Sequence, residues 1–137
     1  KLQELSKCRS SLSFNMIYMS PASRKNNFDA FERFDEGIMP QFKVRTFEIA
    51  SCKSLLLVKK DPWNLVEDFF EPGKDFIYFE NFNELQAIIE DVSKNFESYQ
   101  GVIESAFNRV QDYTVEKIYE YIKQNDNNLI TWRNKHV

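Results

Sequence analysis

The chain has 137 residues and a net charge of -3, a length typical of a single domain with a sizeable core. Apolar residues make up 42% of the chain, which excludes a disordered polar polypeptide. The weakly acidic balance argues against a general nucleic-acid-binding protein, which would present a basic surface. No segment approaches the ~20 apolar residues that span a bilayer, and no signal peptide is visible, so we expect a cytoplasmic location.

Several kinds of catalytic site need residues that this chain lacks. Its 3 glycines are too few and too scattered for a glycine-rich phosphate loop. Its one histidine, His136, stands next to the last residue, which argues against histidine-based triads and zinc sites. The two cysteines, Cys8 and Cys52, lack the CxxC spacing, and we expect both to be reduced, buried thiols.

The first part of the chain predicts a helix, a strand and a second helix. Residues 1–9 indicate a short helix, and alternation over residues 11–19 indicates a strand. Residues 20–40 form a long polar connection, a kind of loop that often carries function. Residues 41–52 then predict a helix with an apolar face.

The middle of the chain predicts two more strands with a helix between them. The apolar run at residues 54–59 is typical of a strand that is buried on both faces. Residues 61–70 predict a helix that Asp61 caps and in which Trp63 is buried. Residues 75–80, rich in aromatic side chains, predict a third strand.

The last part of the chain predicts helices only. Asn81, with Glu84 three residues later, resembles a capping box at the start of an amphipathic helix. Further C-terminal helices are expected over residues 96–124, the second of them capped by Thr114, before a polar tail at residues 125–137.

The order is β–α–β–α–β–α followed by two helices, which predicts an α/β fold with a Rossmann-like parallel sheet and flanking helices. Three strands make a thin sheet, because a doubly wound domain usually has about five or six. We therefore expect residues 1–137 to be a single (sub)domain and a fragment of a longer protein.

In an open parallel sheet, ligands bind beyond the carboxyl ends of the strands, here at residues 20–45, 59–63 and 80–84. Arg45 and Glu48 are three residues apart on a predicted helix and share a face. One interpretation is an ion pair on a solvated surface. The other is a ligand site, in which Arg45 binds diphosphate oxygens and Glu48 accepts hydrogen bonds from a ribose diol.

Other residues near that edge are also open to a structural and a ligand-binding interpretation. The charged candidates are Arg24, Lys25, Arg33, Lys59, Lys60, Asp61 and Glu67. Asn15 either contacts ligand or is buried with a backbone partner. Trp132 either packs within the domain or docks against a partner domain.

A series of short motifs across residues 41–122 carries a family resemblance. The motifs, in order, are Arg45, Phe47-Glu48, Cys52, the strand at 54–59, the run F-E-P-G-K at residues 70–74, and Glu84-Leu85. Together they resemble the C-terminal, donor-binding half of glycosyltransferases that have the GT-B fold of two Rossmann-like domains. The relatives concerned are of the spore-maturation (CgeB-like) type.

The resemblance implies the nucleotide-sugar-binding portion of an enzyme that transfers a sugar from a nucleoside diphosphate donor to an unknown acceptor. Glu48 matches the glutamate that holds the ribose, and Arg45 matches the arginine near the diphosphate. We expect Thr46, Lys59 and Asn15 to complete the donor site. No DxD triplet occurs, which suits a metal-independent reaction without a cofactor. An acceptor domain or partner chain is expected outside this sequence.

Three departures from the family pattern favour an alternative. Lys53 stands where the family has glycine after the cysteine, a helix glycine is replaced near Phe107, and Pro40 replaces an acid of many relatives. They support a non-catalytic Rossmann-like module that serves in assembly. A flavodoxin-like signalling domain is a third hypothesis, disfavoured because such domains begin with a strand.

Overall fold

The computed structural model of the chain describes residues 2–18, 37–117, 119–120 and 123–124. Its strands are β1 (Ser10–Ser13), β2 (Met16–Tyr18), β3 (Ile38–Pro40), β4 (Leu55–Lys59) and β5 (Ile77–Phe79). Its helical elements are α1 (Leu2–Leu5), α4 (Arg45–Ser51), η2 (Leu65–Asp68), α5 (Phe82–Lys94), η3 (Phe96–Tyr99), α6 (Gln100–Val110) and η4 (Gln111–Tyr113).

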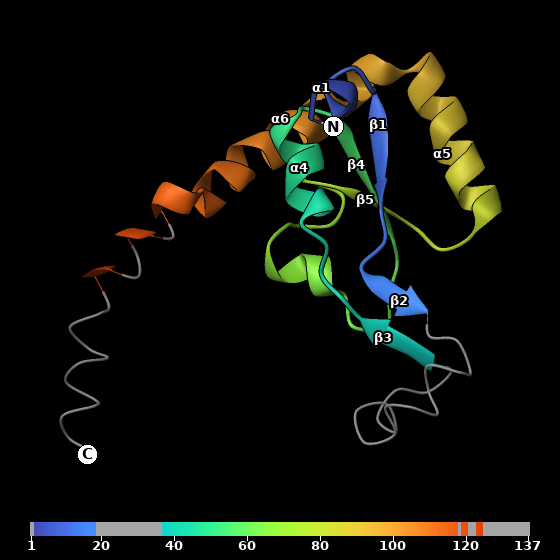
Figure 1. Cartoon of the computed structure of the whole chain (residues 1–137). Helices are drawn as coiled ribbons and strands as arrows, with labels where there is room; N and C mark the ends of the chain where they lie inside the picture. Colours follow the sequence, from blue (N-terminus) through green and yellow to red (C-terminus); the bar gives the residue numbers. More distant parts are fainter. Residues whose placement is uncertain (1, 19–36, 118, 121–122, 125–137) are drawn as a thin grey trace.

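A parallel sheet in the order β1-β4-β5 forms the centre of the molecule. Helix α5 lies on one side of this sheet, and α4 and α6 lie on the other (Figure 1). This arrangement confirms the predicted α/β fold with flanking helices. None of the helices in the described residues is both long and apolar enough to cross a membrane.

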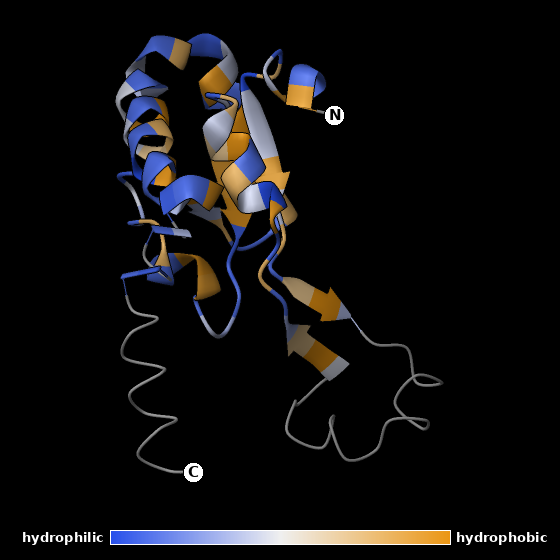
Figure 2. Ribbon diagram, turned by 60° about the vertical axis from the view of Figure 1, so that its left-hand side comes forward, coloured by the Kyte–Doolittle hydropathy of each residue, from blue (hydrophilic) through white to orange (hydrophobic). Residues whose placement is uncertain are grey.

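The central strand β4 supplies both cores. Leu56 and Val58 pack with α4 and α6, whereas Leu55 and Leu57 pack with α5 and with Ile103 of α6. All four side chains are buried, as expected for a strand covered on both faces. Figure 2 shows the resulting apolar strands enclosed between helices with polar outer surfaces.

The prediction of one continuous strand over residues 11–19 is wrong. The chain leaves the sheet at Phe14 and Asn15, and β2 then pairs antiparallel with β3 in a separate ribbon beyond the carboxyl end of the sheet (Figure 1). Strand β3 also shortens the long loop predicted over residues 20–40, because the last three of these residues form a strand. Most of that connection, residues 19–36, lies outside the described part of the chain.

Helix α4 begins at Arg45, later than the start predicted for a helix over residues 41–52. The preceding segment is held by Asn15 instead. The backbone N–H of Gln41 donates to the Asn15 carbonyl at 3.0 Å, and that of Lys43 donates to Asn15 Oδ1 at 2.8 Å. Because these N–H groups donate to Asn15, residues 41–43 do not join the helix, which begins only at Arg45.

The predicted helix over residues 61–70 is reduced to the single turn η2. Asp61 does not cap this turn, whose N-cap is Asn64; the Asp61 Oδ1 accepts from the Trp63 N–H at 2.9 Å in the preceding turn. Asn64 then adopts a left-handed conformation with φ 51°, which interrupts the helix. Trp63, expected to be buried, is 37% exposed.

The helix caps of the last part are confirmed in position. Asn81 Oδ1 accepts from the Glu84 N–H at 3.0 Å, while Glu84 Oε2 accepts from the Glu80 N–H at 2.7 Å. The capping box is therefore displaced by one residue at its second bond. Thr114 Oγ1 accepts from the Lys117 N–H at 3.3 Å, as expected of an N-cap. The helix predicted from residue 96 consists of η3 followed by α6.

Both cysteines are free thiols, as predicted, but their burial differs from the prediction. Cys52 is half-buried against the core under α4, whereas Cys8 is exposed. The exposed position follows from the turn between α1 and β1, which carries Cys8 over the surface.

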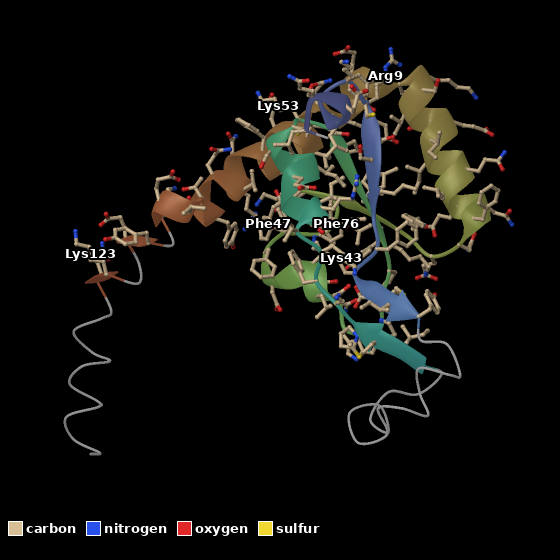
Figure 3. All side chains as sticks on the ribbon, viewed as in Figure 1. Arg9, Lys43, Phe47, Lys53, Phe76 and Lys123 are labelled. Atoms are coloured by element: carbon tan, nitrogen blue, oxygen red, sulfur yellow. The ribbon has the colours of Figure 1, made fainter. Side chains whose placement is uncertain are left out.

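Lys53, one departure from the family resemblance, contacts Phe107, near which another departure falls. Lys53 has φ 54°, a left-handed conformation in which glycine is least strained. Its ammonium lies 4.4 Å from the centre of the Phe107 ring and 2.8 Å from a carboxylate oxygen of Glu104. These contacts join the end of α4 to α6. Figure 3 shows Lys53 and Lys43 at opposite ends of α4, so this pairing lies away from the carboxyl edge of the sheet.

A buried carboxylate ties the turn before β5 to α6. Asp75 is 1% exposed, and one oxygen accepts from the Glu71 N–H at 2.8 Å and pairs with the Arg109 guanidinium. The other oxygen accepts from the Ser105 hydroxyl. This turn contains most of the F-E-P-G-K run at residues 70–74, which therefore lies at the amino end of β5 and serves the packing of α6.

Substituting Arg109→Met tests this tie. The change leaves the Asp75 charge buried without its cation, and we expect unfolding free energy to fall by roughly 2–3 kcal/mol, since Arg109 is itself partly exposed. Urea denaturation measures the loss. The control is Lys74→Met, which removes an exposed ion pair with Glu71 and is expected to cost less than about 1 kcal/mol. Equal losses in the two variants would contradict a role for the buried pair.

Candidate functional site

The carboxyl end of β1 opens into a cavity of about 360 Å³. It is lined by Leu12, Ser13, Phe14, Lys43, Val44 and Arg45. The first three end the strand, and the last three lead into α4. A position beyond the carboxyl end of a strand is where open parallel sheets bind ligands.

Two positive charges line this cavity without a negative partner among the described residues. Neither Lys43 nor Arg45 forms a salt bridge with any residue of the described chain. The ion pair between Arg45 and Glu48, the structural interpretation of their spacing, is not formed. Lys53, by contrast, is paired with Glu104. The cavity therefore suits an anionic ligand, because charged donors bind phosphate oxygens strongly.

Glu48 lies on the same short helix as Arg45, with its side chain half-buried. The two residues are three apart, so their side chains project from the same face of α4. Both residues lie on α4, but only Arg45 lines the cavity; Glu48, one turn further along, is not among its lining residues. Their roles toward a diphosphate and a ribose stay predictions.

Asn15 and Thr46 belong to a buried polar network behind the cavity. The Ser13 and Thr46 hydroxyl oxygens lie 2.8 Å apart, and the Thr46 hydroxyl donates to Asn15 Oδ1 at 3.3 Å. Asn15 Oδ1 also accepts from the Lys43 N–H. The side chains of Ser13, Asn15 and Thr46 are at most 1% exposed, and Asn15 and Thr46 do not line the cavity. They join the end of β1 to the start of α4.

The candidates after β4 form a second cluster, which does not line the cavity. The Lys59 ammonium donates to the Lys60 carbonyl at 3.1 Å, and the Lys60 ammonium lies 4.8 Å from the centre of the Tyr78 ring. The Tyr78 hydroxyl donates to Glu67 at 3.1 Å. Burial raises the pKa of Tyr78 above its usual range, and the hydrogen bond and charge of Glu67 and the charge of Asp61 raise it further.

One residue at the cavity was missed by the sequence analysis. Lys43 fell inside the helix predicted over residues 41–52 and was not singled out, although its place two residues before Arg45 is a signal. Four earlier candidates lie outside the described residues, namely Arg24, Lys25, Arg33 and Trp132. Within the described part of the chain, no group of three or more His, Cys, Asp or Glu side chains could hold a metal ion.

A comparison with protein families matches residues 19–124 to the model of a family described as glycosyl transferase-like. This match covers well over half of the chain and includes all the cavity residues that precede and begin α4. Searches of curated proteins and of solved structures returned no significant match.

The Tyr78–Glu67 contact predicts a specific alkaline titration. The pKa of Tyr78 is raised in the folded state, so its contribution to stability is complete below about pH 10, the value in an unfolded chain, and is lost as the pH rises further. Glu67→Gln removes a negative charge and weakens the acceptor. We expect Tyr78 to ionise at a lower pH in this variant, measured by ultraviolet absorbance of tyrosinate.

Tyr78→Phe is the control that assigns the titration. It should remove the most alkaline ionisation step and leave the steps of the other tyrosines in place. An identical titration curve for the Glu67→Gln variant and the unaltered chain would show that Glu67 does not govern Tyr78.

Proposed function

The chain belongs to the glycosyl transferase-like family, and from that premise we propose that it is the donor-binding portion of a glycosyltransferase. In the whole enzyme it holds a nucleoside diphosphate sugar whose sugar is transferred to an acceptor. The observation that carries this proposal is the cavity beyond β1, which Lys43 and Arg45 line without a carboxylate partner among the described residues, one helical turn before Glu48.

Arg45 and Glu48 bind different parts of the donor, the diphosphate and the ribose. Arg45 lines the cavity, and its forked guanidinium binds diphosphate oxygens. Glu48 lies about 4.5 Å further along the helix axis, a spacing that suits a ribose next to its phosphate. A carboxylate accepts two hydrogen bonds from a ribose diol. Asn15 and Thr46 act indirectly, because their buried network holds the segment that carries these groups.

The finer family assignment is also a proposal. We place the chain with the CgeB-like transferases of the GT-B fold, in which a second Rossmann-like domain faces the donor-binding domain and holds the acceptor. The outer side of β1 has no partner among the described strands. This open side supports the proposal, because it leaves room for further strands of a full Rossmann-like sheet.

The proposed reaction requires no metal ion. Departure of the nucleoside diphosphate leaves negative charge on its phosphate oxygens, and preorganised basic side chains can offset that charge. Lys59 lies at the carboxyl end of the neighbouring strand β4, close to the same edge. We propose that it adds to the positive potential there.

Calorimetric titration with UDP, GDP, ADP and their sugars tests the donor site. We expect saturable binding of one nucleotide to the unaltered chain. The affinity should fall about tenfold or more in Glu48→Gln, because a neutral amide accepts hydrogen bonds from the ribose hydroxyls more weakly than a carboxylate does. The 2′-deoxy form of the same nucleotide should bind the unaltered chain more weakly. On the Glu48→Gln variant, the 2′-deoxy nucleotide should bind almost as well as the normal nucleotide. The two changes should not add, since each removes a different partner of the same hydrogen bond.

Glu4→Gln is the matched control, because it makes the same charge change at an exposed side chain on α1. It should leave nucleotide affinity unchanged. A folded chain that binds none of the nucleotides would contradict the proposal and favour the assembly module. Equal effects of the two glutamate variants would remove Glu48 from the site.

A further inference from the structure

Lys43 lines the cavity but belongs to none of the motifs that carry the family resemblance. We propose that Lys43 is a second diphosphate ligand, which binds one phosphoryl group of the donor while Arg45 binds the other. The inference deepens the proposed donor site and rests on it for the identity of the whole ligand. The pair forms a two-cation clamp for a pyrophosphoryl group.

The exposure of Lys43 and Val44 is the reverse of what the two side chains prefer. Val44, between the two cations, is 70% exposed, whereas Lys43 is half-buried. Valine is usually buried and lysine almost always exposed, since a charge loses hydration when it is buried. Among the described residues, no carboxylate forms an ion pair with the Lys43 ammonium to offset its lost hydration. A bound anion supplies the missing compensation.

The backbone at Lys43 is fixed by groups that are themselves buried. Its N–H donates to Asn15 Oδ1 at 2.8 Å, and the N–H of Gln41 donates to the Asn15 carbonyl at 3.0 Å. The side chain of Asn15 is fully buried. The origin of the Lys43 side chain is therefore set relative to Arg45, which begins a helix two residues later. Preorganised charges bind an anion at a smaller entropic cost than mobile ones.

The two cations differ in a way that fits a diphosphate. Arginine presents planar, paired donors to two oxygens of one phosphate, whereas lysine is a compact charge with three donors. One of each can contact adjacent phosphoryl groups without crowding. The proposal commits to a pyrophosphate group, because it offers two phosphoryl groups to the two cations that line the cavity, and comparison with orthophosphate tests that choice.

Calorimetric titration of the full chain with inorganic pyrophosphate tests Lys43 apart from the nucleoside. We expect saturable binding that is tighter than that of orthophosphate and that weakens about tenfold or more in Lys43→Met. Lys43→Arg, which keeps the charge, should bind within about threefold of the unaltered chain. Lys7→Met is the matched control, because Lys7 is exposed on a different part of the surface.

The outcomes separate this inference from the donor proposal. Unchanged pyrophosphate affinity in Lys43→Met, or no pyrophosphate binding by the unaltered chain, overturns the role of Lys43 even where a nucleotide binds through Glu48. Pyrophosphate binding that depends on Lys43, in a chain that binds no nucleotide, supports the clamp and overturns the nucleotide-sugar proposal. Thermal unfolding of the Lys43→Met variant confirms that the fold is retained.

Discussion

The carboxamide of Asn15 governs the geometry of the carboxyl edge. The Asn15 side-chain oxygen accepts from the Lys43 N–H and the Thr46 hydroxyl. The main-chain carbonyl of the same residue accepts from the Gln41 N–H. The residue thus ends the first strand, delays the start of α4 and joins two segments that are far apart in sequence. Asn15 therefore holds the end of the strand and the start of the helix together, and these two segments line the cavity and carry its two cations.

The opposite end of the sheet carries the ties that keep the helices in place. Asp75 binds Arg109 and Ser105 of α6, and Lys53 bridges from the end of α4 to Glu104. Buried or partly buried ion pairs of this kind are satisfied within the protein. Among the described residues, these ties at the amino end of the sheet are therefore self-compensated, whereas Lys43 and Arg45 at the cavity have no carboxylate partner.

Local sequence signals predicted the elements that depend on local physics. The apolar run of β4, the Asn81 cap and the Thr114 cap are all found where the sequence placed them. The failures have non-local or conformational causes. Alternation alone could not show that Asn15 would bond across to Lys43 and break a strand, nor that Asn64 would turn left-handed within a predicted helix.

The contact between Lys53 and Phe107 changes how the departures from the family pattern are understood. By the resemblance, Lys53 stands where a glycine is expected and a second glycine is expected near Phe107; a lone lysine at positive φ is strained. The aromatic ring and Glu104 receive its ammonium and offset that strain. A lost glycine at a ligand site would indicate lost function, because a side chain would intrude. Here Lys53 packs on Phe107 and Glu104 at the amino end of the sheet, away from the cavity, so its departure from the resemblance is no evidence against the cavity.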